Sequence, residues 1–243
     1  MQTLALVLAA ALAMVHVFAG RLRFLDHLPR TRWLSFASGI SVAYVFVHLL
    51  PEISRGQAAV AEMRAEGAVA AESLLWMVAL LGLAVFYGLE RLALTSRAKN
   101  ASEGDGDRTE AGVFWLHIGS FALYNVLIGY LLLHQPETDT GGLLFFWAAM
   151  AVHFIVNDHG LREHHQHRYQ HAGRWLLAAA TVIGALLGLA TDLGEATVAT
   201  LTAFLGGGVV LNVLKEELPE ERKSRYVPFV LGAAIYTALL MAL

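Results

Sequence analysis

Eight apolar runs, each long enough to cross a lipid bilayer, recur along the chain. A spanning helix needs about 20 predominantly apolar residues, and 57% of the 243 residues are hydrophobic while 15% are charged. Strands of a membrane barrel would alternate apolar and polar residues, so the runs predict helices. The expected spans cover residues 2–20, 33–51, 73–92, 112–134, 142–161, 174–191, 195–216 and 226–243. We therefore expect an all-α polytopic membrane protein with one membrane domain over residues 1–243.

Basic residues gather in alternate connections between these runs. All but two of the seventeen Lys and Arg residues, the exceptions being Arg55 and Arg64, lie in or beside the connections between spans one and two, three and four, five and six, and seven and eight. The positive-inside rule places these connections in the cytoplasm. Arg21 and Arg23 follow the first run directly, which is the wrong polarity for a cleaved signal peptide. We therefore expect a multi-pass protein of the cell membrane with a retained first span and both termini on the non-cytoplasmic side.

Two segments of fourteen residues resemble each other without gaps. They are GISVAYVFVHLLPE at residues 39–52 and GGVVLNVLKEELPE at residues 207–220. The predicted orientation places their ends on opposite sides of the bilayer, which is typical of the inverted repeats of secondary transporters. We predict an inverted 3+2+3 arrangement, with a three-helix half at residues 1–95, a central pair at 112–161 and an inverted half at 174–243. Two helices that merely end at Leu-Pro-Glu are the simpler alternative, because proline often terminates helices.

Polar side chains inside the fifth span are the first candidates for function, because ionisable residues in a membrane are costly. His153 and Asn157 are four positions apart and share a helix face, and Asp158 follows. Imidazole and amide groups can bind a divalent ion, and they can equally hydrogen-bond between helices. Asp158 could pair with Arg162, one turn further on. Of the other polar groups in the spans, we expect His16, His117 and Asn212 to make structural hydrogen bonds.

A histidine-rich segment follows the fifth span. It contains five histidines, namely His159, His164, His165, His167 and His171. Such tracts can bind metal ions, so we predict a possible cytoplasmic metal-binding loop with weak, exchangeable binding. A basic loop that titrates near neutral pH is the alternative. The absence of cysteine excludes disulfides and thiolate metal ligands, and a net charge of −3 gives no reason to expect a nucleic-acid partner.

Eight spans with HLLPE closing the second and ELPE closing the seventh resemble the ZIP family of divalent zinc and iron transporters, over nearly the whole chain. The family's fourth-span motif, His-Asn-x-Pro-Glu-Gly, aligns with residues 124–129. Its fifth-span motif, His-x-x-Pro-Glu-Gly, aligns with residues 153–158, and its sixth-span Glu-Pro-x-Gly-Ala pattern falls on residues 181–185. The resemblance implies a transporter with no resident cofactor that carries a divalent metal, most simply zinc, as its substrate. It also implies a homodimer in the lipid bilayer.

Most family ligands are replaced in this chain. Tyr124 stands where the family has His, and Asn125 and His153 match family ligand types. Three positions that the family fills with Glu hold other residues, namely Ile128, Asn157 and Thr181. The motif prolines are absent too, so the central helices have less reason to unwind. The resemblance therefore implies a reduced site at Asn125, His153 and Asn157, with Asp158 as its nearest carboxylate.

Three hypotheses follow. The first is a ZIP-like divalent cation transporter that alternates access by rocking one half against the other, and the second is a ZIP-shaped sensor or carrier of another solute. A metal-dependent intramembrane hydrolase is the third, but no hydrolase motif is present and we do not expect an enzyme. Gly184 and Gly188 form a small-xxx-small pair, which could serve a dimer or packing within one chain.

Overall fold

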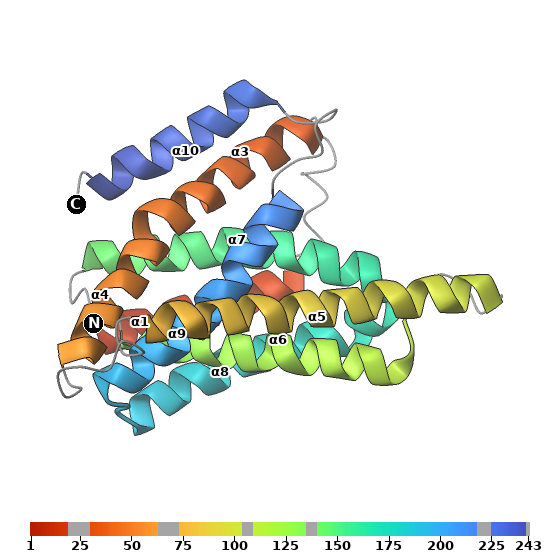
Figure 1. Cartoon of the computed structure of the whole chain (residues 1–243), viewed down its shortest axis with the longest axis horizontal. Coiled ribbons are helices and arrows are strands. Elements are labelled where there is room, and N and C mark those ends of the chain that lie inside the picture. The colour runs from red at the N-terminus through yellow and green to blue at the C-terminus, as the bar shows by residue number, and fades with distance from the viewer. Residues whose placement is uncertain (19–29, 63–72, 104–108, 135–139, 218–224, 242–243) are drawn as a thin grey trace. The chain divides into compact units, whose positions relative to one another are not determined.

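The computed structural model describes residues 1–18, 30–62, 73–103, 109–134, 140–217 and 225–241, and all the secondary structure in these ranges is helical (Figure 1). Within these ranges, six helical segments are long and apolar enough to cross a membrane: Ser35–Ala58, Leu74–Glu103, Ala111–Leu131, Thr140–Arg162, Tyr169–Ala190 and Glu195–Lys215. Two shorter apolar helices, Gln2–Phe18 and Tyr226–Met241, lie where the first and last spans are expected. The all-α class is therefore confirmed, and the length and composition of these helices indicate a multi-pass membrane protein.

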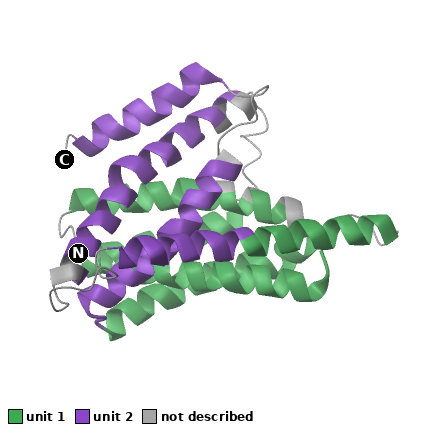
Figure 2. Cartoon of the chain, in the orientation of Figure 1, with its two compact units in different colours: residues 1–28, 88–191, 243 green, residues 29–87, 192–242 purple. Residues whose placement is uncertain are grey.

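The helices form two compact units (Figure 2). Unit 1 covers residues 1–28, 88–191 and 243, and unit 2 covers residues 29–87 and 192–242. Unit 1 contains α1 (Gln2–Phe18), α6 (Ala111–Leu131), α7 (Thr140–Arg168), the π turn η4 (Tyr169–Gly173) and α8 (Arg174–Ala190). Unit 2 contains α3 (Arg30–Tyr44), the π turn η2 (Val45–Leu49), α4 (Leu50–Glu62), α9 (Glu195–Asn212), the π turn η5 (Val213–Glu217) and α10 (Tyr226–Met241). The long helix α5 (Leu74–Glu103) contributes to both units.

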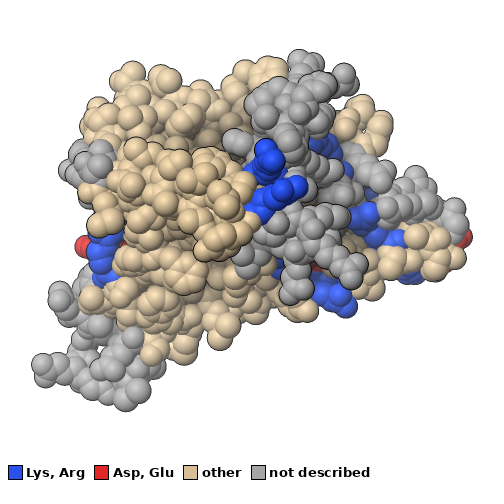
Figure 3. Space-filling model, turned by 90° about the horizontal axis from the view of Figure 1, so that it is seen from above, with Lys and Arg blue, Asp and Glu red and all other residues tan. Residues whose placement is uncertain are grey.

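Each unit keeps large apolar side chains on its outside. Leu123 of unit 1 is 60% exposed, and Leu80 and Leu231 of unit 2 are 64% and 51% exposed. Most of the described residues visible in Figure 3 are neither basic nor acidic. Helices that are apolar on both their buried and their outward sides are typical of membrane spans, because lipid replaces water as the solvent of the outer face.

The second predicted span does not end at Pro51. The chain stays helical through η2 and α4 as far as Glu62. The amide of Leu50 bonds to the carbonyl of Val45, five residues back, so the helix is widened just before the proline. A π turn shifts the hydrogen-bond ladder at the point where proline lacks an N–H, and this explains why the helix continues. A second π turn, η5, precedes Pro219 in the other fourteen-residue segment.

Reciprocal glycine contacts hold three helix pairs together. A Cβ at Gly129 of α6 would overlap the carbonyl oxygen of Thr181, and one at Gly184 of α8 would overlap that of Val126. The same relation joins Gly39 with Gly232 across α3 and α10, and Gly82 with Gly207 across α5 and α9. In every case the carbonyl belongs to the residue three positions before the partner glycine. Small residues let backbones approach closely enough for dispersion and Cα–H···O contacts, which drive helix association where hydrophobic burial cannot.

The contact of Gly184 resolves one alternative left open by the sequence. Because Gly184 has no side chain, α8 can pack closely against α6 of the same chain. Gly188 lies against Leu133, in the segment that follows α6. This small-xxx-small pair therefore serves packing within the chain.

We predict that Gly129→Ala destabilises unit 1 by about 1 to 3 kcal/mol, the usual cost of overpacking, because α6 and α8 must separate. Gly119→Ala is the matched control, since Gly119 lies on the same helix and a Cβ there meets nothing within 4 Å. Thermal unfolding of the detergent-purified variants measures the difference. Equal midpoints for the two variants would contradict the assigned role of the α6–α8 contact.

Candidate functional site

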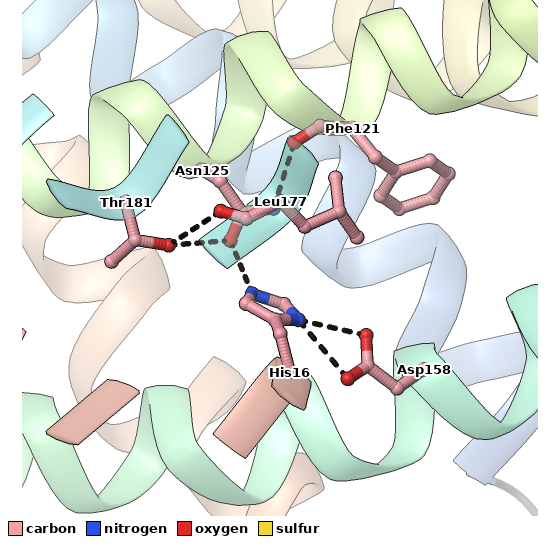
Figure 4. A network of polar contacts seen from close by, with 6 residues as sticks. All are labelled: His16, Phe121, Asn125, Asp158, Leu177 and Thr181. Atoms are coloured by element: carbon pink, nitrogen blue, oxygen red, sulfur yellow. Dashed lines mark hydrogen bonds and ion pairs between the residues drawn. The ribbon is translucent and has the colours of Figure 1, made fainter. Parts of the chain in front are cut away.

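A cluster of polar side chains lies inside unit 1, with His16 of α1 at its centre (Figure 4). The imidazole Nδ1 lies 2.9 and 3.0 Å from the two carboxylate oxygens of Asp158 on α7. The Nε2 atom lies 2.7 Å from Oδ1 of Asn125 on α6. His16 and Asp158 are each 1% exposed and Asn125 is fully buried. Thr181 of α8 also belongs to the cluster, which therefore combines residues of α1, α6, α7 and α8.

The hydrogen bonds of Asn125 fix the protonation of His16. The Asn125 amide Nδ2 donates to the Phe121 carbonyl at 2.8 Å, so Oδ1 faces the cluster as an acceptor. The Thr181 hydroxyl lies 3.1 Å from this Oδ1 and 3.1 Å from the Leu177 carbonyl. Because an amide oxygen only accepts hydrogen bonds, the Nε2 atom of His16 must carry a proton.

Asp158 shares a second proton with His16. With Nε2 protonated, the contact between Nδ1 and the carboxylate needs one more proton, held either as an imidazolium–carboxylate pair or as an imidazole and a carboxylic acid. Both forms have a total charge of zero. A buried carboxylate is tolerated only where an opposite charge or a proton compensates it, and His16 meets this requirement for Asp158.

Tyr169 lies beside this network. Its hydroxyl is buried in η4, where the Asp158 carboxylate is close enough to interact with it both as a charge and as a hydrogen-bond acceptor. The adjacent Gly173 makes room for the ring, since a Cβ there would lie 2.7 Å from a ring atom of Tyr169. The phenol is thus an available donor beside the Asp158 carboxylate.

The four predicted metal ligands fall into different surroundings. Asn125 and Asp158 belong to one cluster, bridged by His16. His153 lies on the same helix as Asp158, and its Nε2 is 3.1 Å from the Tyr124 hydroxyl. The Asn157 amide nitrogen is buried without a hydrogen bond in the described structure. In the described part of the chain, no three His, Cys, Asp or Glu side chains are grouped so that they could hold a metal ion.

The structural hydrogen bonds expected of His16 are present, and they join the candidate ligands Asn125 and Asp158. The ring of His16 packs on the fully buried Phe154 at a centroid distance of 4.3 Å. Pairing of Asp158 with Arg162 stays a prediction. No local signal marks this position, because His16 is one histidine in an otherwise apolar helix. Only the packing of α1 against α7 and α8 brings it to Asp158.

A second buried network involves a histidine of the predicted metal-binding loop. His165 Nε2 lies 2.9 Å from Nδ1 of His117, and His165 Nδ1 lies 2.7 Å from the Thr109 hydroxyl. Arg168 donates to the Thr109 carbonyl at 2.9 Å. These bonds join the start of α6 to the end of α7, so His165 has a structural role here.

The histidine-rich segment is not a loop. α7 runs to Arg168 and continues through η4 into α8, and no glycine or proline interrupts residues 161–172. His165 is buried, whereas His167 and His171 are exposed. The side chains of His159 and His164 lie outside the described residues.

Comparison with known proteins assigns no family: no family model matches the chain, and no curated protein matches its sequence.

We predict that His16→Ala destabilises the protein by about 3 to 5 kcal/mol, the cost of leaving one member of a buried ion pair alone. The double variant His16→Ala/Asp158→Ala should recover part of this loss, because it removes the uncompensated carboxylate as well. Chemical unfolding in detergent measures both effects, with Met14→Ala, a 50% exposed position on the same helix, as the control. Strictly additive losses in the double variant would rule out the coupling.

Proposed function

We propose that this protein is a ZIP-like carrier that moves divalent metal cations, zinc or a similar ion, across the cell membrane. The observation that carries the proposal is the buried cluster of His16, Asn125, Asp158 and Thr181, drawn from α1, α6, α7 and α8. Buried polar side chains within membrane helices mark ion and substrate pathways. Asn125 and Thr181 occupy positions that the ZIP motifs assign to ligands, and Asp158 closes the fifth-span motif.

The eight-span inverted repeat belongs to the same proposal. The two π turns begin at aligned valines, Val45 and Val213, of the two fourteen-residue segments. The aligned glycines also make equivalent contacts: Gly39 packs on Phe229 of the last helix of the second half, and Gly207 packs on Ala79 of the last helix of the first half. Such agreement favours a true repeat over two helices that share a terminator. We propose that the basic connections face the cytoplasm and that the termini lie outside.

Binding of a metal ion would require the cluster to lose the protons that its hydrogen bonds now hold. A dication needs a neutral imidazole and an ionised carboxylate, so the protons of His16 and Asp158 would have to leave when it binds. The cluster would then offer imidazole, carboxylate, amide and hydroxyl ligands, a donor set that suits zinc or iron. His153 and Tyr124 lie next to this set on the same two helices, α7 and α6.

One observation favours a second candidate function. His16 already provides hydrogen-bond partners for both Asp158 and Asn125, so the centre is complete without a metal ion. A ZIP-shaped sensor, or a carrier of a different solute, would need no metal ligands there. Metal analysis of the purified protein separates the two functions, because a stoichiometric bound ion counts against this second candidate.

We predict that zinc uptake into proteoliposomes falls at least about tenfold in Asp158→Asn, since even an indirect contact to a metal is worth about 10–100-fold in affinity. An internal zinc-sensitive dye reports the uptake. The control is again Met14→Ala, which lies on α1 but outside the cluster. Asp158→Asn keeps the shape of the side chain and so limits the effect on folding. Unchanged uptake in Asp158→Asn, or no uptake by the native protein, would refute the metal-carrier function.

A further inference from the structure

Two exposed histidines lie side by side where α7 meets η4. The rings of His167 and His171 are 3.8 Å apart between centroids and 21° from parallel. Both side chains are exposed to solvent. His167 lies between the candidate spans Thr140–Arg162 and Tyr169–Ala190, and His171 is the third residue of the second span. The pair is thus placed near the end of the membrane helices, where water reaches it.

A backbone contact sets the tautomer of His171. Its Nδ1 lies 3.0 Å from the carbonyl oxygen of His167, one helical turn earlier. Because a carbonyl oxygen can only accept, Nδ1 carries the proton and donates it. In the neutral ring the lone pair is then on Nε2, at the outer end of the side chain. Metal-binding histidines are oriented in the same way, with the second nitrogen bonded to a carbonyl or carboxylate.

Two other described histidines of unit 1, His165 and His134, lack this combination. His165 is buried and bonds to His117 and Thr109 through both of its nitrogens. His134 also lies near a carbonyl, that of Tyr130, but its ring is stacked on the Tyr130 ring at 4.3 Å instead of on a second imidazole. Among the described side chains of the histidine-rich segment, the exposed pair is therefore His167 and His171.

We propose that His167 and His171 form a two-histidine chelating site for a divalent transition metal. Imidazoles one turn apart on a helix share one face, and the helix fixes their separation before an ion arrives. Imidazole nitrogen favours Zn²⁺, Ni²⁺ and Cu²⁺ over Mg²⁺ and Ca²⁺, which prefer oxygen. With two protein ligands, water completes the coordination, so the site exchanges its ion more readily than a structural zinc site with four protein ligands.

This site does not rest on the proposed transport function. It uses two side chains outside the buried cluster, and it would bind metal even if the membrane helices carried another solute. If the protein does carry metal, an exchangeable site at the end of α7 would give the ion a first stop outside the membrane.

The test measures Cu²⁺ and Zn²⁺ binding to the full chain in detergent. Electron paramagnetic resonance with substoichiometric Cu²⁺ counts the coordinating imidazole nitrogens, and competition with a chromophoric chelator gives the Kd for Zn²⁺. We expect two imidazole nitrogens in the native protein. His171→Ala should leave one nitrogen and raise the Kd about 100-fold, because the second ligand of a linked pair acts at high effective concentration.

His167→Ala should behave in the same way as His171→Ala, and His134→Ala should bind like the native protein. Since both members of the pair are exposed, circular dichroism and gel filtration should show unchanged folding in these variants. A native spectrum with one coordinating imidazole, or a Kd that either substitution leaves unchanged, would overturn the proposal and reduce the pair to a stacking contact. Loss of zinc uptake in Asp158→Asn with binding at this pair retained would separate the two proposals.

Discussion

Burying a carboxylate among apolar helices is the costliest step in building unit 1. Asp158 is almost inaccessible, and desolvation of a lone carboxylate there would cost several kcal/mol. His16 offsets this desolvation through a contact of Nδ1 with both carboxylate oxygens. Asn125 accepts a hydrogen bond from the other ring nitrogen of His16, Nε2. The arrangement requires α1, α6 and α7 to keep their mutual register. The buried pair therefore helps to fix the position of each of these helices within unit 1.

Close backbone contact supplies the remaining cohesion. Lipid tails are as apolar as leucine, so membrane helices gain little from burying leucine against each other. The glycine pairs instead bring carbonyl oxygens against Cα atoms, as at Gly129 and Gly184 between α6 and α8. This contact also fixes the position of Thr181 along the helix axis relative to Asn125, because Gly129 packs against the backbone carbonyl oxygen of Thr181. Packing and site geometry are in this way set by the same residues.

The sequence predicts the helices well and their ends less well. Apolar run length is a direct consequence of bilayer thickness, so every expected span corresponds to a helix in the described structure. The extension past Pro51 was not predicted, because a proline reads as a terminator unless the preceding turn widens. The polarity of residues 159–173 likewise predicts a loop, whereas the chain stays helical there.

The sequence predicts only part of the candidate site, because the type of a residue does not reveal its hydrogen-bond partners. Asn125 and Asp158 were identified as polar groups in a membrane segment, a signal visible in one chain. His16 is also visible as a polar group in a span, but its hydrogen-bond partners lie 109 and 142 positions away in sequence, so the sequence does not reveal them. The eleven histidines make the same point. His16 neutralises a buried acid, His165 joins two helices, and His167 and His171 face water as a pair. Identical side chains thus differ in chemistry because each one has a different set of neighbours, and those neighbours are set by packing that no short motif encodes.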